Sequence, residues 1–211
     1  MSEIWINLGW ECNINHSKGE VPYFTWGVGT LQEAVDYVAY FQKIVACMKS
    51  AKTQSVFKFT WNVNGGPPYV SKIIEACYPG DDVVDAVGME MYDGWGGNEM
   101  PPGGRNPDGT FVDPAAVWQT NYDLGYGRMR DFCVQHRKAY AVPEWGLSPA
   151  PSQSTAIGAG GDNPTFIQKF AQYVNSFPRV AYVNYFNIAA SDTNHLLDTF
   201  PNSKAAFRSY W

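Results

Sequence analysis

The chain has 211 residues, of which 45% are apolar, 17% are charged and 16% are aromatic. This composition argues for a globular chain rather than a disordered one, and we expect a single domain over residues 1–211. The formal net charge of −5 argues against nucleic acid as a partner. Eight Trp and thirteen Tyr residues weakly favour a carbohydrate protein, because aromatic rings stack on the apolar faces of sugars.

The sequence shows no segment that would insert into a membrane. No stretch approaches the roughly 20 apolar residues of a membrane span, and Met1–Ile6 lacks the basic and apolar parts of a signal peptide. We therefore expect no membrane partner. Export to the periplasm or the medium would need a signal that is not visible in this sequence.

The cysteines stand far apart, without a C-x-x-C pair or a His at ligand spacing, which argues against a zinc site. Because a free Cys behaves as a small hydrophobe, we expect buried free thiols, with one disulfide as the alternative. The four residues are Cys12, Cys47, Cys77 and Cys133.

Apolar strand-like runs alternate with helical patterns along the chain. The predicted strands are Ile4–Trp10, Val56–Val63, Val83–Met91, Ala139–Trp145 and Val180–Phe186. The predicted helices are Leu31 to about Ser50, a segment near Tyr69–Cys77, a segment from Pro114 towards His136, Thr165–Phe177 and Ser203–Tyr210.

Helix-start signals support these assignments. Thr30 and Glu33 form a capping box before the first helix, and Asp113 and Asn163 each precede a proline at a helix start. Spacings of three and four predict a buried face of the first helix made by Leu31, Val35, Val38, Phe41, Val45 and Met48. The long irregular stretch Gly94–Val112 is of a length that is more often functional than incidental.

Strict alternation of five strands with five helices predicts an α/β fold, a partial (β/α)₈ barrel of five βα units. The competing fold is an open doubly wound sheet. It is disfavoured because no glycine-rich phosphate turn follows the first strand. A nucleotide or redox enzyme on such a sheet is the least favoured function class for the same reason.

Two glutamates are the candidate catalytic residues. Glu11 follows the first strand and Glu144 ends the fourth, in the run A-Y-A-V-P-E-W-G. Barrels present catalytic groups at the carboxyl ends of their strands, and a carboxylate pair is what acid-catalysed cleavage of a glycosidic bond needs. A surface carboxylate for Glu11 and a structural ion pair for Glu144 are the alternatives. A carboxyl separation of about 5–5.5 Å would imply retention of configuration, and about 6.5–9.5 Å inversion.

The order of several motifs resembles glycoside hydrolase family 26, a barrel family that includes β-mannanases. The motifs are I-N-L-G-W-E-C-N, W-N-V-N-G-G, Y-P-G-D-D-x-V-D-A-V-G-M-E-M-Y-D, V-P-E-W-G-L and G-G-D-N-P-T-F-I. They run from Ile4 to the end of the chain. The resemblance implies that the chain corresponds to the C-terminal five-eighths of the family's barrel.

The resemblance also implies roles for individual residues. Glu11 would be the acid/base and Glu144 the nucleophile, while Tyr92 would steady the nucleophile through its hydroxyl. Sugar contacts would come from Tyr92 together with Trp10, Asn13, Trp61 and Trp145. Trp61 and Trp145 could equally be plain core, because Trp is mostly buried in any fold. No cofactor or metal is implied.

The chain departs from the family in two ways. Trp10 occupies the position before the acid/base where mannanases of the family usually have His, which puts the substrate in doubt. The first three βα units are missing, so two sheet edges would be exposed unless a longer polypeptide, another chain or a second copy covers them.

Two function classes follow. The first is a retaining, endo-acting glycoside hydrolase that cleaves a β-linked, mannan-like polysaccharide by double displacement. The second is a non-catalytic carbohydrate-binding or structural assembly subunit that keeps the fold. Binding survives the loss of part of a barrel more easily than catalysis, which tolerates little misplacement.

Overall fold

The computed structural model describes residues 2–14, 24–51, 53–65, 74–93, 113–149, 160–190 and 194–211. Five strands form one sheet: β1 (Glu3–Asn7), β2 (Val56–Asn64), β3 (Ala86–Tyr92), β4 (Ala139–Gly146) and β5 (Val180–Tyr185). The predicted long stretch Gly94–Val112 lies outside the described residues, as does most of the helix predicted near Tyr69–Cys77.

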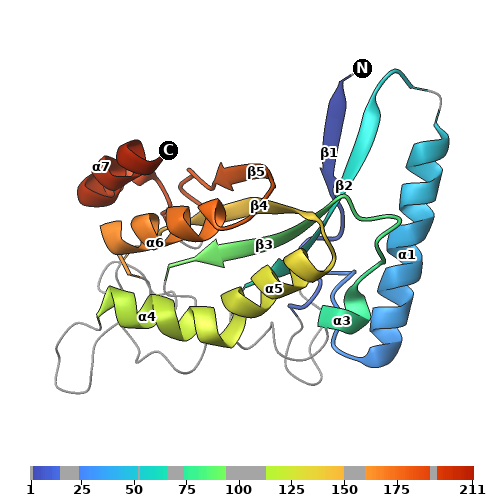
Figure 1. The fold of residues 1–211 in the computed structure, drawn as a ribbon, viewed down its shortest axis with the longest axis horizontal. Coiled ribbons are helices and arrows are strands. Elements are labelled where there is room, and N and C mark those ends of the chain that lie inside the picture. The colour runs from blue at the N-terminus through green and yellow to red at the C-terminus, as the bar shows by residue number, and fades with distance from the viewer. Residues whose placement is uncertain are drawn as a thin grey trace.

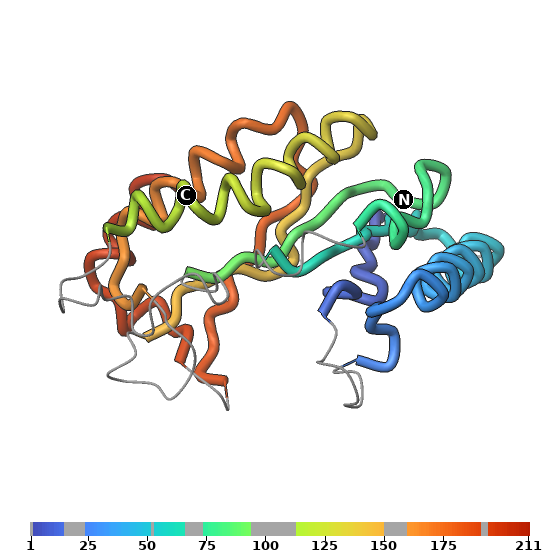
Figure 2. The backbone as a smooth tube through the Cα atoms, turned by 90° about the horizontal axis from the view of Figure 1, so that it is seen from below, coloured from blue at the N-terminus to red at the C-terminus, as the bar shows by residue number. Residues whose placement is uncertain are grey.

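The strands lie side by side in chain order and all neighbouring pairs are parallel. Figure 1 shows this sheet with helices between successive strands, and in Figure 2 it curves as an arch with helices along its outer side. The prediction of a partial barrel made of five βα units is thereby confirmed. Within the described residues β1 pairs only with β2 and β5 only with β4, so each has one open edge.

The helices occupy the connections between strands. They are α1 (Leu31–Ser50), α3 (Ile74–Cys77), α4 (Pro114–Asn121), α5 (Gly127–Gln135), α6 (Pro164–Asn175) and α7 (Pro201–Tyr210). The capping box predicted at Thr30 and Glu33 is present, and the side chains of Asp113 and Asn163 cap α4 and α6. Within the described ranges, no helix is long and apolar enough to span a bilayer.

The buried face of α1 differs from the prediction. Ala34, Tyr37, Phe41 and Val45 are buried, whereas Leu31 and Val35 are exposed. The Tyr37 hydroxyl donates a hydrogen bond to the backbone oxygen of Gly9, 3.0 Å away, and this bond holds the Tyr37 side of the helix against the end of β1. The predicted helix from Pro114 towards His136 is interrupted by a π-helical segment, Tyr122–Tyr126, between α4 and α5.

The concave face of the sheet is lined by small side chains. Ala86, Ala139 and Ala141 form a buried cluster, and Trp5 and Tyr182 pack on it. Trp5 lies on β1 and Tyr182 on β5, at opposite edges of the sheet, yet their ring centroids are 5.7 Å apart. The sheet is therefore curled tightly enough for its two edges to meet across the concave face.

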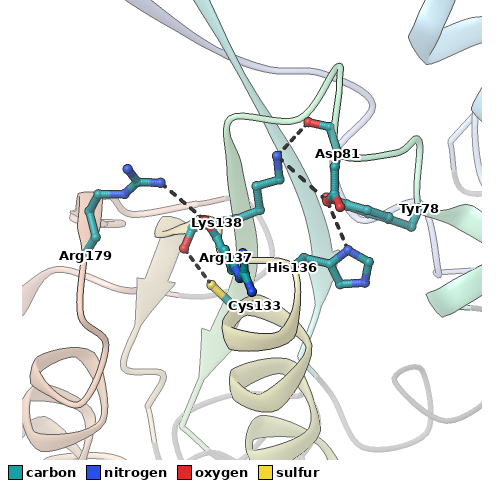
Figure 3. Close-up of polar contacts among 7 residues, drawn as sticks. All are labelled: Tyr78, Asp81, Cys133, His136, Arg137, Lys138 and Arg179. Carbon is teal, nitrogen blue, oxygen red and sulfur yellow. Dashed lines mark hydrogen bonds and ion pairs between the residues drawn. The ribbon is translucent and has the colours of Figure 1, made fainter.

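A polar network lies at the amino ends of β3 and β4 (Figure 3). Asp81 accepts hydrogen bonds from the Tyr78 hydroxyl at 2.7 Å and contacts Nδ1 of His136 at 3.0 Å. The Lys138 ammonium donates to the Asp81 backbone oxygen at 2.6 Å. The network joins the loop before β3 to the loop before β4. Contacts at this end of a barrel serve stability, whereas catalytic groups lie at the other end.

All four cysteines are free. Cys12, Cys77 and Cys133 are buried, as expected for thiols that act as small hydrophobes, but Cys47 is exposed. Cys47 lies on α1 near its carboxyl end and is not among the buried residues of that helix.

Candidate active site

The carboxyl ends of β1 to β4 bring five polar side chains together. Glu90 and Tyr92 are on β3, Glu144 is on β4, Asn64 ends β2 and Glu11 follows β1. Glu90 and Tyr92 share one face of β3, because alternate residues of a strand point to the same side. The sequence predicted Glu11, Tyr92 and Glu144 for this site, and the structure brings them together.

Glu11 lies in a turn after β1 rather than in the strand itself. The strand predicted to run to Trp10 ends at Asn7, and Glu11 adopts a left-handed backbone conformation with φ of 51°. Its amide donates to the backbone oxygen of Asn62 at 3.1 Å, and its carboxylate accepts a hydrogen bond from the Asn64 side chain at 2.5 Å. Strained backbone of this kind often accompanies functional positions, because the surrounding structure must hold it in place.

Asn13 holds in place Asn64, the residue that donates to Glu11. Asn13 is buried, and its side-chain amide forms two hydrogen bonds with the backbone of Asn64. Its Nδ2 donates to the Asn64 carbonyl oxygen at 2.9 Å, and its Oδ1 accepts from the Asn64 amide at 2.8 Å. Asn64 in turn donates to Glu11. The structure therefore places Asn13, predicted as a sugar contact, where it fixes the end of β2 next to the acid/base candidate.

Glu90 is a third carboxyl group that sequence reasoning missed. It is 4% exposed and accepts a hydrogen bond of 2.5 Å from the Asn62 side chain. Burial raises the pKa of Glu90 well above its ordinary value, and the nearby charges of Glu11 and Glu144 raise it further. A hydrogen bond between the Glu90 and Glu11 side chains also raises the pKa of Glu90 and lowers that of Glu11.

The pKa of Glu11 is also raised. Burial is the main cause, and the negative charge of Glu144 adds to it, while hydrogen bonds from Glu90 and Asn64 oppose the rise. A carboxyl group with a raised pKa keeps its proton to a higher pH, which a general acid requires.

Glu144 accepts a hydrogen bond of 2.5 Å from the Tyr92 hydroxyl. Burial raises the pKa of the Tyr92 phenol, and its bond to Glu144 raises it further, so Tyr92 stays a proton donor. A donated hydrogen bond holds one carboxylate oxygen in place and leaves the other for chemistry. This is the relation between the two residues that the family resemblance implied.

Trp10 is part of an aromatic cluster beside Glu11. Its ring lies 4.6 Å from Trp26 and 5.5 Å from Phe24, and Phe24 and Trp26 stack in parallel. The Trp26 indole donates to the Trp10 backbone oxygen at 2.8 Å. Trp10 is 39% exposed, so part of its ring faces solvent next to the acid/base candidate. Such a surface suits stacking against a sugar ring.

Trp61 and Trp145 lie elsewhere. Trp61 is fully buried against Tyr78 and Phe132, on the face of β2 opposite to Asn62. Trp145 is buried against residues of α6 and α7, with the Phe170 ring centroid 3.9 Å away. Both indoles are on the helix side of the sheet, away from the carboxyl groups. Their packing matches the alternative that the sequence left open, a place in the hydrophobic core.

The arrangement pairs two carboxyl groups, those of Glu11 and Glu144, that have different hydrogen-bond partners. Among the described residues, no group of three or more His, Cys, Asp or Glu side chains is placed to hold a metal ion. Glu90, Asn62 and Asn64 went unnoticed in the sequence, although their spacing of two along strands would have placed them on the face that carries Tyr92.

The fold is that of family 26 β-mannanases whose structures are solved, which confirms at the level of fold the resemblance seen in the sequence. A family 26 β-mannanase from Bacteroides ovatus matches with a TM-score of 0.58 and 14% identity, over 99% of this chain and 50% of that one. A Cellulomonas fimi endo-β-1,4-mannanase double mutant matches with a TM-score of 0.56 and 18% identity, over 90% of this chain and 38% of that one.

A third solved structure, a family 26 protein of a Muricauda species, matches with a TM-score of 0.55 and 19% identity, over 88% of this chain and 44% of that one. The chain thus spans no more than half the length of these three proteins. Its sequence matches no protein-family model and no curated protein.

Proposed function

We propose that the chain carries the catalytic end of a retaining, endo-acting glycoside hydrolase, with Glu144 as the nucleophile and Glu11 as the acid/base. The observation that carries this proposal is that the carboxyl groups of Glu144 and Glu11 lie in different environments. Tyr92 donates a hydrogen bond to Glu144, whereas the pKa of Glu11 is raised by burial and by the charge of Glu144. Two carboxyl groups with different environments take different roles in acid/base chemistry.

In the first step of the proposed reaction the Glu144 carboxylate attacks the anomeric carbon. The bond from that carbon to the leaving oxygen breaks, and the leaving oxygen takes the proton of Glu11. In the second step the Glu11 carboxylate takes a proton from water. The water oxygen attacks the anomeric carbon and releases Glu144, and the two inversions together retain the configuration.

The surrounding residues would hold the two glutamates for these steps. Asn64 would orient the Glu11 carboxyl, and Tyr92 would keep one oxygen of Glu144 fixed during attack. The exposed part of the Trp10 ring would stack on a sugar unit next to Glu11. The chemistry of the proposal needs no metal and no organic cofactor.

We infer a β-linked, mannan-like polysaccharide as the substrate class. This choice follows the solved structures of similar fold, two of which are described as β-mannanases. A polymer of this kind is too large to enter a cell intact, so we also infer that the protein acts outside the cytoplasm. Trp10 would adapt the site to a sugar or linkage that differs from the usual mannan substrate.

The experiment measures release of reducing ends from mannan, glucomannan, xylan and mixed-linkage β-glucan by the wild type, Glu144→Gln and Glu11→Gln. Loss of a nucleophile typically costs on the order of 10⁴-fold or more in kcat, so we expect Glu144→Gln to be inactive on any glycan the wild type cleaves. Glu75→Gln, which changes an exposed carboxylate paired with Arg128, should keep full activity.

Proton NMR of the first product then tests the mechanism. The product should appear with the β configuration of the substrate and mutarotate later. An initial α product would contradict double displacement. Wild type that is folded but inactive on every glycan would contradict the hydrolase proposal itself.

A non-catalytic carbohydrate-binding subunit is the second candidate. The observation that favours it is the open sheet, since the strands of three further βα units are needed to close a barrel of eight. Another chain or a second copy of this one would then complete the wall. Under this function the wild type and Glu144→Gln would bind a β-glycan equally well in affinity electrophoresis, and neither would cleave it.

A further inference from the structure

His195 packs against the ring of Tyr92. It is 4% exposed and follows β5, in the segment that leads to α7. Its ring centroid is 4.9 Å from that of Tyr92 and 5.3 Å from that of Phe186. No sequence spacing links this histidine to the two glutamates, so it was not predicted as a site residue.

Three groups form a slot for the Tyr92 ring. Gly146, at the end of β4, lies on one side; a Cβ added to it would be 3.0 Å from Cε1 of Tyr92. Phe186 and His195 lie against the ring from the β5 side. With its ring held between these groups, Tyr92 has little freedom to turn, and its hydroxyl stays directed at Glu144.

The His195 ring is itself fixed by hydrogen bonding to the segment that directly follows β4. Its Nδ1 lies 2.8 Å from the backbone oxygen of Leu147, three residues after Glu144, and 3.4 Å from the Ser148 hydroxyl. A carbonyl oxygen only accepts, so Nδ1 carries the proton of this bond. The His195 carbonyl accepts from the Tyr185 hydroxyl at 3.1 Å, and its amide donates to Ile188 at 2.9 Å.

We propose that His195 is a positioning residue for the nucleophile: tied to the Leu147 carbonyl, its ring forms the back wall that aims the Tyr92 hydroxyl at Glu144. This assignment rests on the proposed function, because it concerns the attack by Glu144. His195 acts only through Tyr92 and touches neither the sugar nor the reacting atoms.

The kinetic test is a double-mutant cycle. His195→Ala should lower kcat about 10-fold or more with little change in KM, because the nucleophile loses its fixed orientation without any loss of a sugar contact. In a Tyr92→Phe background the same substitution should change kcat less than about 2-fold, since the hydroxyl through which His195 acts is already absent. His195→Phe, which restores a ring against Tyr92, should recover part of the activity.

Two results would overturn the proposal. One is an equal loss of kcat from His195→Ala in both backgrounds, which would mean a role independent of Tyr92. The other is a loss confined to KM, which would mean a sugar contact. His136→Ala is the matched control, since His136 is the histidine paired with Asp81 at the far end of the strands, and it should leave kcat unchanged.

A measurement without substrate separates this proposal from the hydrolase function. In protein labelled with ¹³C at the tyrosine Cζ, the Tyr92 signal is assigned by its loss in Tyr92→Phe. His195→Ala should shift that signal and His136→Ala should not, whether or not the protein cleaves a glycan. An unchanged Tyr92 signal in folded His195→Ala protein would contradict the positioning role, and an inactive wild type with the expected shift would contradict only the hydrolase.

Discussion

Glu90 is a buried carboxyl group that interacts with both predicted catalytic residues. Burial raises its pKa well above the ordinary value, and the charge of Glu11 adds to the rise. Its hydrogen bond with Glu11 is among the causes that lower the pKa of Glu11. Glu90 therefore limits how far burial can raise the pKa of Glu11.

Substitution of Glu90 tests this relation through pH. The first chemical step needs Glu11 protonated, so the basic limb of a kcat/KM profile reports the Glu11 pKa. Glu90→Ala removes a donor to the Glu11 carboxylate, so the Glu11 pKa should rise and the limb should move to higher pH. Glu90→Gln keeps a neutral donor and should leave the limb near its wild-type position. The measurement is kcat/KM between about pH 5 and 9.

The opposite shift would reveal an ionised Glu90. Its negative charge would then raise the Glu11 pKa, and Glu90→Ala would move the basic limb to lower pH. A shift of the same size in Glu90→Ala and Glu90→Gln would show that the donated hydrogen bond has no part in the effect.

The residues of the site were only partly predictable. Glu11, Tyr92 and Glu144 stood at ends of apolar runs next to distinctive motifs, so position and resemblance both pointed to them. Glu90 lies inside the run Val83–Met91, which indicates a buried strand, and a lone Glu there has no partner nearby in sequence. Its partners come from β2, across 28 residues for Asn62, and only the strand pairing brings them together.

Among the elements, β3 and α6 are linked by one buried carboxylate. Asp93 directly follows β3 and is 3% exposed. Its Oδ2 accepts a hydrogen bond of 2.9 Å from the side chain of Asn163, the residue whose Oδ1 caps α6. A Cβ on Gly160 would lie 1.8 Å from the same oxygen, so that position has room for glycine alone. Asp93 thus fixes where the chain enters α6.

This link predicts an unusual dependence of stability on pH. Burial raises the pKa of Asp93 to about 7, against an ordinary value of 3.8. The folded state then binds the proton more tightly than the unfolded state, so the Asp93 contribution favours folding below about pH 4 and is lost as the pH rises to about 7. At about 1.4 kcal/mol per pKa unit the whole loss is on the order of 4 kcal/mol.

Asp93→Asn should remove this loss, because the amide oxygen can still accept from Asn163 and carries no charge. We expect its free energy of unfolding in urea to exceed that of the wild type at about pH 8 and to match it at about pH 4. Asp131→Asn changes an exposed carboxylate and serves as the control. A variant that follows the wild-type pH dependence throughout would contradict a buried, neutral Asp93.

Elements were predicted more reliably than the faces they bury. The capping box, the two helix starts with proline and all five strands follow from local signals. The buried face of α1 does not, because Leu31 and Val35 fit a helical stripe that happens to face solvent. The helix packs instead through Ala34 and Tyr37. The hydrogen bond from Tyr37 to Gly9 is a tertiary contact, so the helix sequence alone does not predict it.

On the scale of the whole molecule, alternation of strands and helices was enough to predict five units of a barrel. The partial barrel implied a curved sheet, but the contact of Trp5 with Tyr182 across its concave face was not predictable from the sequence. These two residues lie 177 positions apart, on the strands with open edges. The curled sheet covers part of its own concave face but leaves the backbone groups along β1 and β5 without a second neighbouring strand among the described residues.

Open strand edges predict that this chain, purified by itself, associates with itself. Unpaired amide and carbonyl groups on an edge strand pair readily with another chain, and nearby exposed apolar side chains favour the contact. Ile4 on β1 is 40% exposed and Val180 on β5 is 37% exposed. Sedimentation velocity should show a weight-average mass that rises with protein concentration.

Ile4→Lys should shift the chain towards monomer at each concentration, because a charged side chain on an edge strand opposes pairing with a second strand. Val134→Lys adds the same charge at a residue of α5 that is 46% exposed and far from either edge in sequence, so it should leave association unchanged. Equal effects of the two substitutions would mean that net charge and not the β1 edge controls association. A wild type that stays monomeric at every concentration would mean that the curled sheet protects its edges, and the contact of Trp5 with Tyr182 would then be the physical reason.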